Sequence, residues 1–253
     1  MALSEQEKER YKKHIQLKQV GLAGQEKLKN SSVLVVGAGG LGSPVLLYLA
    51  GAGVGHIGIV DGDKVSLSNL QRQVLHTTRL LDAPKVESAW KRLGELNPEI
   101  VVNIHADRIT QKNAAEMIRD YEIVVDCTDN LETRFLINET CVKQGIPMVY
   151  GAVFEYEGQV AVFDAKRGPC LRCMIPEIPP VGSVPDPEAH GLLNSVPGVI
   201  GMLQATEVLK LILGVGEPLI GKLLLYDSLT TTTQTIRLNK QADCPVCSIQ
   251  SNE

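Results

Sequence analysis

The chain is poor in aromatic residues, carries no strong excess of either charge and has no long uninterrupted apolar run. Aromatic residues make up 4% of its 253 residues, and the formal net charge is −4. This weak negative charge gives no electrostatic reason to expect a nucleic-acid surface. A transmembrane helix needs about 18 consecutive apolar residues, which no window contains, and the polar start MALSEQEKERYKKH lacks the apolar core of a signal peptide. We therefore expect a cytoplasmic protein that binds neither nucleic acid nor a membrane.

What the chain does have is enough apolar sequence for one large core. Hydrophobic residues make up 44% of it, which suits a globular domain. Short apolar runs alternate with amphipathic segments through the first part of the chain, and this predicts a doubly wound, mostly parallel α/β sheet of the Rossmann type. Later, residues 159–163, 223–226 and 232–238 have the pattern of strands without helices between them. We expect these to extend the same sheet as antiparallel strands.

A glycine-rich turn stands at the centre of this pattern. The apolar run 33–36 leads into it, a helical segment follows, and a second apolar run, 57–60, ends on Asp61. The spacing predicts a mononucleotide-binding unit, in which glycines let the backbone approach phosphates and the carboxylate binds a ribose hydroxyl. The glycines expected at the nucleotide are Gly37, Gly39, Gly40 and Gly42. The same fingerprint also fits a nicotinamide-dependent oxidoreductase.

Polar residues follow at three places that a parallel sheet would bring to the same edge as the glycine turn. Taken singly, exposed cations are usually solvated, and an Asp after a strand is often a helix cap. Together they suit phosphate chemistry better than hydride transfer, since Arg72 and Lys85 can neutralise phosphate oxygens and Asp129 can hold Mg²⁺. The residues expected at the nucleotide are Ser68, Asn69, Leu70, Gln71, Arg72, Lys85, Asp129 and Asn130.

The pattern divides a single domain, residues 1–253, into three segments. Residues 1–30 are helix-prone, with Ser4 and Glu7 placed for a capping box, and the stretch from Gly21 to Gly24 is expected to separate two helical pieces. Residues 31–150 form the nucleotide-binding half, and residues 151–253 carry the later strands. In the last segment, a proline-rich stretch between residues 175 and 197 predicts a mobile surface loop.

Four of the six cysteines form two CxxC pairs. Cys170 and Cys173 make one pair, and Cys244 and Cys247 make the other. In a reducing compartment, two such pairs predict a four-thiolate zinc site better than disulfides. Of the two single cysteines, we expect Cys127 to be a small buried hydrophobe, and we assign no role to Cys141.

Several longer motifs occur together: VLVVGAGGLGSPV, AGVGHIGIVDGDKVSLSNLQRQVLH, PKVESAWKRLGELNP and VVDCTDN, followed by the CxxC pairs. In this combination the chain resembles the MoeB/ThiF/HesA group, adenylyltransferases that activate ubiquitin-like sulfur carriers and are relatives of the ubiquitin-activating enzymes. The resemblance covers nearly the whole chain, from about Arg10 to Cys247.

The resemblance implies a reaction and assigns parts of the site. Mg-ATP would lie on the glycine turn, with Asp61 on the ribose, Asn69, Arg72 and Lys85 on the phosphates, and Asp129 on the Mg²⁺. The second substrate would be the C-terminal Gly-Gly carboxylate of a small β-grasp carrier, giving an acyl-adenylate and pyrophosphate. A sulfur donor would then form the thiocarboxylate used for molybdopterin, thiamin, thiolated tRNA or cysteine. Zn²⁺ on the four cysteines would be structural, and residues 151–253 would bind the carrier.

The chain departs from the family pattern at two positions. The resemblance implies a homodimer in which an N-terminal Arg of one subunit reaches the ATP of the other, and here Lys13 takes that place. A lysine keeps the charge but loses the bidentate guanidinium. Members that form a covalent sulfur intermediate often carry a cysteine in the proline-rich loop, where this chain has Pro187. Residues 174–243 contain no cysteine, so we expect sulfur to be transferred directly to the acyl-adenylate.

Two other functions remain open from the sequence. One is a non-catalytic or scaffold relative, and the other is adenylation of a non-protein carboxylate, such as one linked to tRNA.

His76 shows no metal-ligand spacing with the other histidines or with the CxxC pairs, and it is assigned no role. Trp90 falls on the apolar positions of a predicted helix and is expected in the core.

Overall fold

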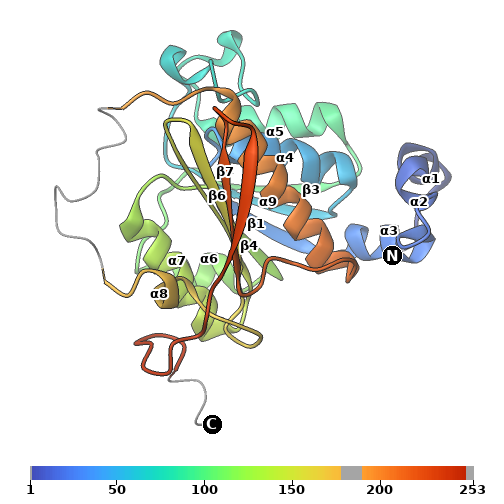
Figure 1. Ribbon diagram of the computed structural model, residues 1–253. Helices are drawn as coiled ribbons and strands as arrows, with labels where there is room; N and C mark the ends of the chain where they lie inside the picture. The colour runs from blue at the N-terminus through green and yellow to red at the C-terminus, as the bar shows by residue number, and fades with distance from the viewer. Residues whose placement is uncertain (1, 178–189, 249–253) are drawn as a thin grey trace.

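The computed structural model describes residues 2–177 and 190–248, and these build one twisted sheet with helices on both faces (Figure 1). The strand order across the eight strands of the described chain is β3-β2-β1-β4-β5-β6-β7-β8. Their bounds are β1 (Ser32–Val36), β2 (His56–Val60), β3 (Val101–His105), β4 (Ile123–Asp126), β5 (Met148–Phe154), β6 (Glu157–Phe163), β7 (Lys222–Asp227) and β8 (Thr232–Arg237). The Pro187 position and most of the predicted proline-rich loop lie outside the described residues.

The two flanks of the sheet differ in strand direction. β1 pairs in parallel with β2 and β4, β2 with β3, and β4 with β5. The pairings of β5 with β6, β6 with β7 and β7 with β8 are all antiparallel. This confirms the predicted fold class. The order along the sheet reverses between β1 and β4, and in open α/β sheets such a switch point is where ligands bind.

Helices cover the sheet in two layers. One core cluster packs α4, α5 and α9 against one face, and a second packs α6, α7 and α8 against the other (Figure 1). The bounds are α1 (Glu5–Arg10), α2 (Lys12–Ile15), α3 (Gly21–Asn30), α4 (Gly42–Ala52), α5 (Lys85–Leu96), α6 (Ala114–Ile118), α7 (Leu131–Gln144), α8 (Leu171–Met174) and α9 (Ser195–Leu213), with 3₁₀ turns η1 (Leu67–Asn69) and η2 (Thr78–Leu80).

Helix α9 is long and apolar enough, by length and composition, to cross a membrane. It instead packs against α4, β5 and β6, and the larger core cluster includes its Val196, Ile200 and Val208. The helix begins at Ser195, with Pro197 in its first turn, where a missing N–H is tolerated. Its apolar character is therefore that of a core helix.

One local expectation in the first thirty residues is confirmed, since the capping box of Ser4 and Glu7 is present. Two other local expectations were wrong. α3 begins at Gly21 and runs through Gly24, so these glycines do not separate two helical pieces. A Cβ on Gly24 would lie 3.1 Å from Leu213 Cδ2, so the glycine lets α3 approach α9. Trp90 is 51% exposed. The buried side of α5 does not reach it, because that side consists of Lys85, Val86, Ser88, Ala89 and Leu93.

Candidate active site

The glycine loop, residues 37–42, connects the end of β1 to the start of α4. Gly37 has a φ of +100°, a conformation that L side chains rarely adopt, and a Cβ there would lie 2.6 Å from the carbonyl oxygen of Cys127. A Cβ on Gly42 would overlap the carbonyl oxygen of Gly37. Both positions therefore require glycine, and the loop presents backbone rather than side chains at the N-terminus of α4.

The peptide groups of Ala38 are held from both sides. Its N–H donates to Asp61 Oδ2 over 2.8 Å, and its carbonyl oxygen lies 2.8 Å from His76 Nε2. The other oxygen of Asp61 accepts from the N–H of Asp63 over 2.8 Å. Asp61, the predicted ribose ligand, thus also joins the end of β2 to the glycine loop.

Lys85 is the first residue of α5 and is buried, with 5% of its surface exposed. Its Nζ lies 3.1 Å from Asp63 Oδ2, while Asp63 Oδ1 lies 3.1 Å from Nη2 of Arg108. Burial alone would raise the pKa of Asp63, but the hydrogen bond and charge of Lys85, together with Arg108, outweigh burial and lower it. The carboxylate therefore stays ionised and holds Lys85 at the edge of the sheet.

The segment from Ser68 to Gln73 folds over the glycine loop. A Cβ on Gly40 would lie 3.6 Å from Arg72 Cγ, and one on Gly39 would lie 3.5 Å from Gln73 Nε2. Nη1 of Arg72 donates to the carbonyl of Ser68 over 3.3 Å. The structure thus brings Arg72 beside the predicted loop. In the same segment Ser68 is exposed and Asn69 and Leu70 are half-buried, while the carbonyl of Gln71 accepts from Asn194 Nδ2, at the start of α9.

The end of β4 carries the predicted metal ligand. Asp129 is exposed, and Nδ2 of Asn130 lies 3.4 Å from its Oδ1. The helix cap at this position is Asn130, whose side-chain oxygen accepts from the N–H of Thr133 over 2.9 Å. The residue that caps α7 is therefore Asn130 and not Asp129, so the alternative interpretation of Asp129 as a helix cap is wrong. β4 lies beside β1, so Asp129 follows the strand next to the glycine loop.

A buried polar network lies beneath this edge, and the sequence did not reveal it. Gln204 of α9 donates to the carbonyl of Asp126 over 2.7 Å, and the side chain of Arg134 donates to the carbonyl of Thr128 over 2.5 Å. Burial raises the pKa of Asp126, against the opposing charge of Arg134, whose Nε lies 3.9 Å from Asp126 Oδ2. These contacts fix the end of β4 against α9 and α7.

Lys13 lies elsewhere in the chain. It is exposed on α2, two residues after Tyr11, which packs against Gly53 at the C-terminal end of α4. The glycine loop is at the other end of α4, about 16 Å away for a helix of this length. Within one chain the structure therefore does not bring Lys13 to the loop, and its role across a dimer stays a prediction.

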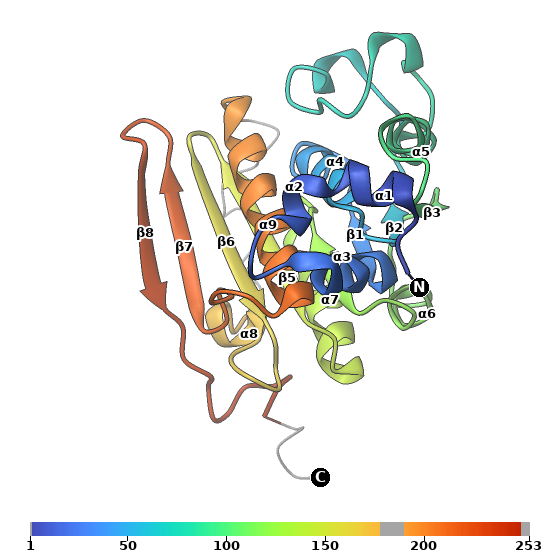
Figure 2. The same ribbon diagram turned by 90° about the vertical axis from the view of Figure 1, so that its right-hand side faces the viewer.

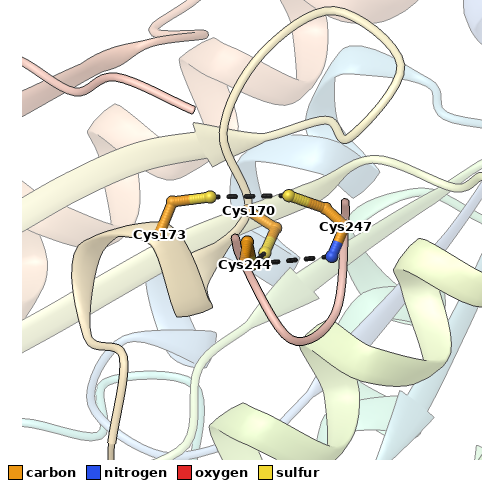
Figure 3. A group of neighbouring side chains, drawn as sticks. All are labelled: Cys170, Cys173, Cys244 and Cys247. Atoms are coloured by element: carbon orange, nitrogen blue, oxygen red, sulfur yellow. Dashed lines mark hydrogen bonds between the residues drawn. The ribbon is translucent and has the colours of Figure 1, made fainter. Parts of the chain in front are cut away.

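The four cysteines of the CxxC pairs converge, as predicted. Their sulfur atoms all lie within 4.8 Å of one another, although the pairs are far apart in the sequence (Figure 3). Sγ of Cys170 is 3.6 Å from Sγ of Cys244, and Sγ of Cys173 is 3.4 Å from Sγ of Cys247. All four are free thiols and buried. A tetrahedral metal with bonds of about 2.3 Å would place its sulfur ligands about 3.8 Å apart, so the cluster fits a metal ion.

The thiols of this cluster differ in acidity. Burial and the neighbouring Cys173 raise the pKa of Cys170 to about 11. Burial also acts on Cys244, but the backbone N–H groups of Cys247 and Val246 outweigh it and lower the pKa to about 7. Such N–H groups stabilise a thiolate, the form that binds a metal. The N–H of Gln241 lies 3.4 Å from Cys173 Sγ.

Sequence comparison decides the family. Residues 11–246 match the profile of the ThiF family, which is nearly the whole chain. The chain belongs to the ThiF family. This confirms the resemblance drawn from the glycine turn, the residues after β2 and the CxxC pairs.

Two curated relatives show how far the similarity extends. The sulfur carrier protein adenylyltransferase of Thermus thermophilus is 47% identical over 252 residues, which cover 98% of this chain and 93% of the relative. The adenylyltransferase and sulfurtransferase MOCS3 of Culex quinquefasciatus is 49% identical over 247 residues, which cover 97% of this chain and 56% of the relative. The chain thus spans nearly all of the first relative and about half of the second.

Among solved structures, that of E. coli MccB with MccA-N7isoASN superposes with a TM-score of 0.84 at 24% identity. The match covers 95% of this chain and 74% of that one. At this identity the likeness shows that the ThiF-family chain shares its fold with MccB.

Proposed function

We propose that this protein uses Mg-ATP to adenylate the C-terminal Gly-Gly carboxylate of a ubiquitin-like sulfur carrier, giving the acyl-adenylate and pyrophosphate. The observation that carries the proposal is the near full-length similarity to a sulfur carrier protein adenylyltransferase. It is supported by the glycine loop, with Arg72 beside it, and by Lys85, which is buried at the start of α5. We also propose that residues 1–253 act as one domain, with the carrier bound by residues 151–253.

The nucleotide would bind across the ends of β1, β2 and β4. Backbone N–H groups of the glycine loop and the N-terminus of α4 favour phosphate oxygens. Asp61 is half-buried at the end of β2, which suits a ligand of the ribose hydroxyls. The residues proposed to contact the nucleotide are Gly37, Gly39, Gly40, Gly42, Asp61, Ser68, Asn69, Leu70, Gln71, Arg72, Lys85, Asp129 and Asn130.

The chemistry needs charge neutralisation and no general base. A C-terminal carboxylate has a pKa of about 3.5, so the nucleophile is already ionised at neutral pH. Its oxygen attacks the α-phosphorus, and the bond to the β-phosphate breaks to release pyrophosphate. Lys85 and Arg72 would stabilise the charge that develops on the phosphate oxygens. Asp129 would hold a Mg²⁺ ion, which when bound neutralises the triphosphate.

We propose that the cysteine cluster binds Zn²⁺ and that this site is structural. Four thiolates are a common ligand set for structural zinc. The cluster joins α8 to the segment after β8, remote from the glycine loop in sequence and in fold (Figure 1). We further propose a homodimer in which Lys13 reaches the partner's nucleotide, and a separate sulfur donor that converts the adenylate into the thiocarboxylate.

The proposal is tested by ATP–pyrophosphate exchange with purified protein, Mg²⁺ and a panel of Gly-Gly-terminated β-grasp carriers. Each carrier is compared with a copy that lacks the last glycine. We expect exchange with one full-length carrier and none with its truncated copy, which would also identify the pathway. Binding of ATP without exchange for any carrier would contradict the proposal.

A further inference from the structure

His76 is a buried residue outside the set of proposed nucleotide ligands. It is 6% exposed and lies between the glycine loop and α5. Its Nε2 is 2.8 Å from the carbonyl oxygen of Ala38, and its Nδ1 is 2.9 Å from Oγ of Ser88. Both ring nitrogens therefore have partners on two different elements. We call the set Ala38, His76 and Ser88 the histidine bridge.

The partners of His76 determine its tautomer. A carbonyl oxygen can only accept a hydrogen bond, so Nε2 carries the proton and donates to Ala38. In the neutral ring Nδ1 then accepts from the hydroxyl of Ser88. Two charged groups act on the ring from neighbouring elements, Lys85 on α5 and Asp61 at the end of β2. Burial lowers the pKa of His76 and the charge of Lys85 adds to the lowering, and together they outweigh the hydrogen bond to Ala38 and the charge of Asp61, which raise it.

The histidine bridge joins two parts of the proposed site. Ala38 lies within the glycine loop, and Asp61 already holds its N–H. Ser88 lies three residues after Lys85, on the same face of α5 and one helical turn away. The ring therefore fixes the distance between the loop that would receive the phosphates and the helix that carries the cation.

We propose that His76, as the neutral Nε2–H tautomer, is a positioning residue that holds the glycine loop against the helix carrying Lys85 and so prepares the phosphate site. This inference rests on the proposed function, because it concerns how that nucleotide site is held. His76 contacts the loop backbone and Ser88, and it acts on the nucleotide only through them.

The test compares four variants by calorimetric Kd for Mg-ATP without carrier, and by KM for ATP and kcat in carrier-dependent exchange. His76→Phe keeps a ring but removes both hydrogen bonds, whereas His76→Gln can donate to Ala38 and accept from Ser88. Ser88→Ala removes one partner. His56→Gln is the matched control, since His56 begins β2 at the opposite end from Asp61.

We expect His76→Phe to raise both Kd and KM for ATP about tenfold, the size expected when a buried hydrogen-bond partner is lost. KM for the carrier should stay unchanged. His76→Gln should recover most of the affinity, Ser88→Ala should fall between, and His56→Gln should match wild type. A purely structural loss would instead lower the active fraction, and with it kcat, at unchanged KM.

Unchanged Kd and KM in soluble, folded His76→Phe would overturn the bridge while leaving the adenylation proposal intact. Normal ATP binding with no exchange in wild type would overturn the adenylation proposal, and the Kd series would still judge the bridge. If His76→Phe does not fold, the Kd values of Ser88→Ala and His76→Gln for Mg-ATP test the proposal in its place.

Imidazole ¹⁵N spectra of the wild-type protein provide a readout independent of activity, because they must show the Nε2–H tautomer at neutral pH. An Nδ1–H tautomer, or no ATP binding at all, would overturn the bridge.

Discussion

The two flanks of the sheet are held together by different means. β1, β2 and β4 are buried along almost their whole length between two helical layers. β8 is exposed at every residue and forms the outer edge of the sheet, as Figure 2 shows. The chain after β8 is fixed by four cysteines, with Ala165, Val142 and Val246 around them, rather than by a broad apolar core.

The two flanks therefore have different proposed roles, nucleotide binding on the parallel flank and metal binding that stabilises the fold on the antiparallel flank. The proposed nucleotide site stands on the parallel flank, where apolar burial fixes the strand ends that carry Gly37, Asp61 and Asp129. On the antiparallel flank a metal can take over the stabilising role of a core, because an ion that binds only the folded chain adds its binding energy to folding. The flanks should therefore respond differently to the same kind of damage.

The largest effect should come from removing a metal ligand. Cys244→Ser should lower the free energy of unfolding by about 3–5 kcal/mol, since the remaining thiols hold the ion poorly. It should reduce the exchange rate per folded molecule much less. Denaturant unfolding, zinc analysis and exchange measure the three quantities, and Cys141→Ala, a buried thiol outside the cluster, is the control. A variant with full zinc and normal stability that is nevertheless inactive would contradict this prediction, because Cys244 would then act in the reaction rather than in stability.

Truncation of an apolar side chain should lower the free energy of unfolding more on the parallel flank than on the antiparallel flank. Leu34→Ala, at a fully buried position of β1, should lower the free energy of unfolding by about 2–5 kcal/mol. Ile236→Ala on β8 should lower it by less than about 1 kcal/mol, because that side chain is 39% exposed. Urea unfolding measures both. Equal losses would mean that β8 has a hidden apolar partner, such as another subunit.

Loss of the buried cation should affect chemistry more than folding. Lys85→Ala should lower kcat for exchange about 10²–10³-fold, the usual effect of removing one group that stabilises transition-state charge. The exposed Lys91→Ala on the same helix should change it less than about twofold. Steady-state exchange and thermal unfolding together measure the contrast. A similar fall in both variants would show that the charge of the helix, and not the position of Lys85, matters.

The smallest effect should be a dependence of stability on pH through His76. Its pKa is lowered from the usual 6.5 by burial, so below pH 6.5 the unfolded chain takes up a proton that the folded chain does not. The titration of His76 therefore does not change the free energy of unfolding above pH 6.5. As pH falls from 6.5 towards the lowered pKa, the free energy of unfolding decreases by at most about 1.4 kcal/mol per pH unit. Urea unfolding of wild type and His76→Gln should diverge only on the acid side; parallel curves would mean that His76 titrates normally.

Features encoded by short-range pattern could be predicted from the sequence. The glycine loop is one, because Gly37 and Gly42 must lack side chains for local steric reasons, and the strand-end placement of Asp61 and Asp129 follows from alternating strands and helices. The cysteine cluster is another, since two CxxC pairs have few other uses in a reducing compartment.

The residues that were missed depend on contacts between distant segments. Ala38 and His76 are 38 positions apart, and Asp126 and Gln204 are 78 apart, so no local pattern links them. A lone histidine gives no spacing signal, and Gln204 differs from its apolar neighbours only as a polar residue on a core helix. Asp63 offered a weak signal, two residues after Asp61, but its link to Lys85 required the fold. Trp90 was misplaced because periodicity does not give the width of the buried face.

The central claim is that the carrier carboxylate attacks the α-phosphorus of ATP, and an isotope experiment tests it directly. The carrier is labelled with ¹⁸O in its C-terminal carboxylate, incubated with the enzyme, Mg²⁺ and ATP, and treated with a thiol that cleaves the product at its acyl carbon. The account predicts AMP that carries one ¹⁸O atom, with unlabelled pyrophosphate. Unlabelled AMP, or ADP together with labelled phosphate, would contradict it.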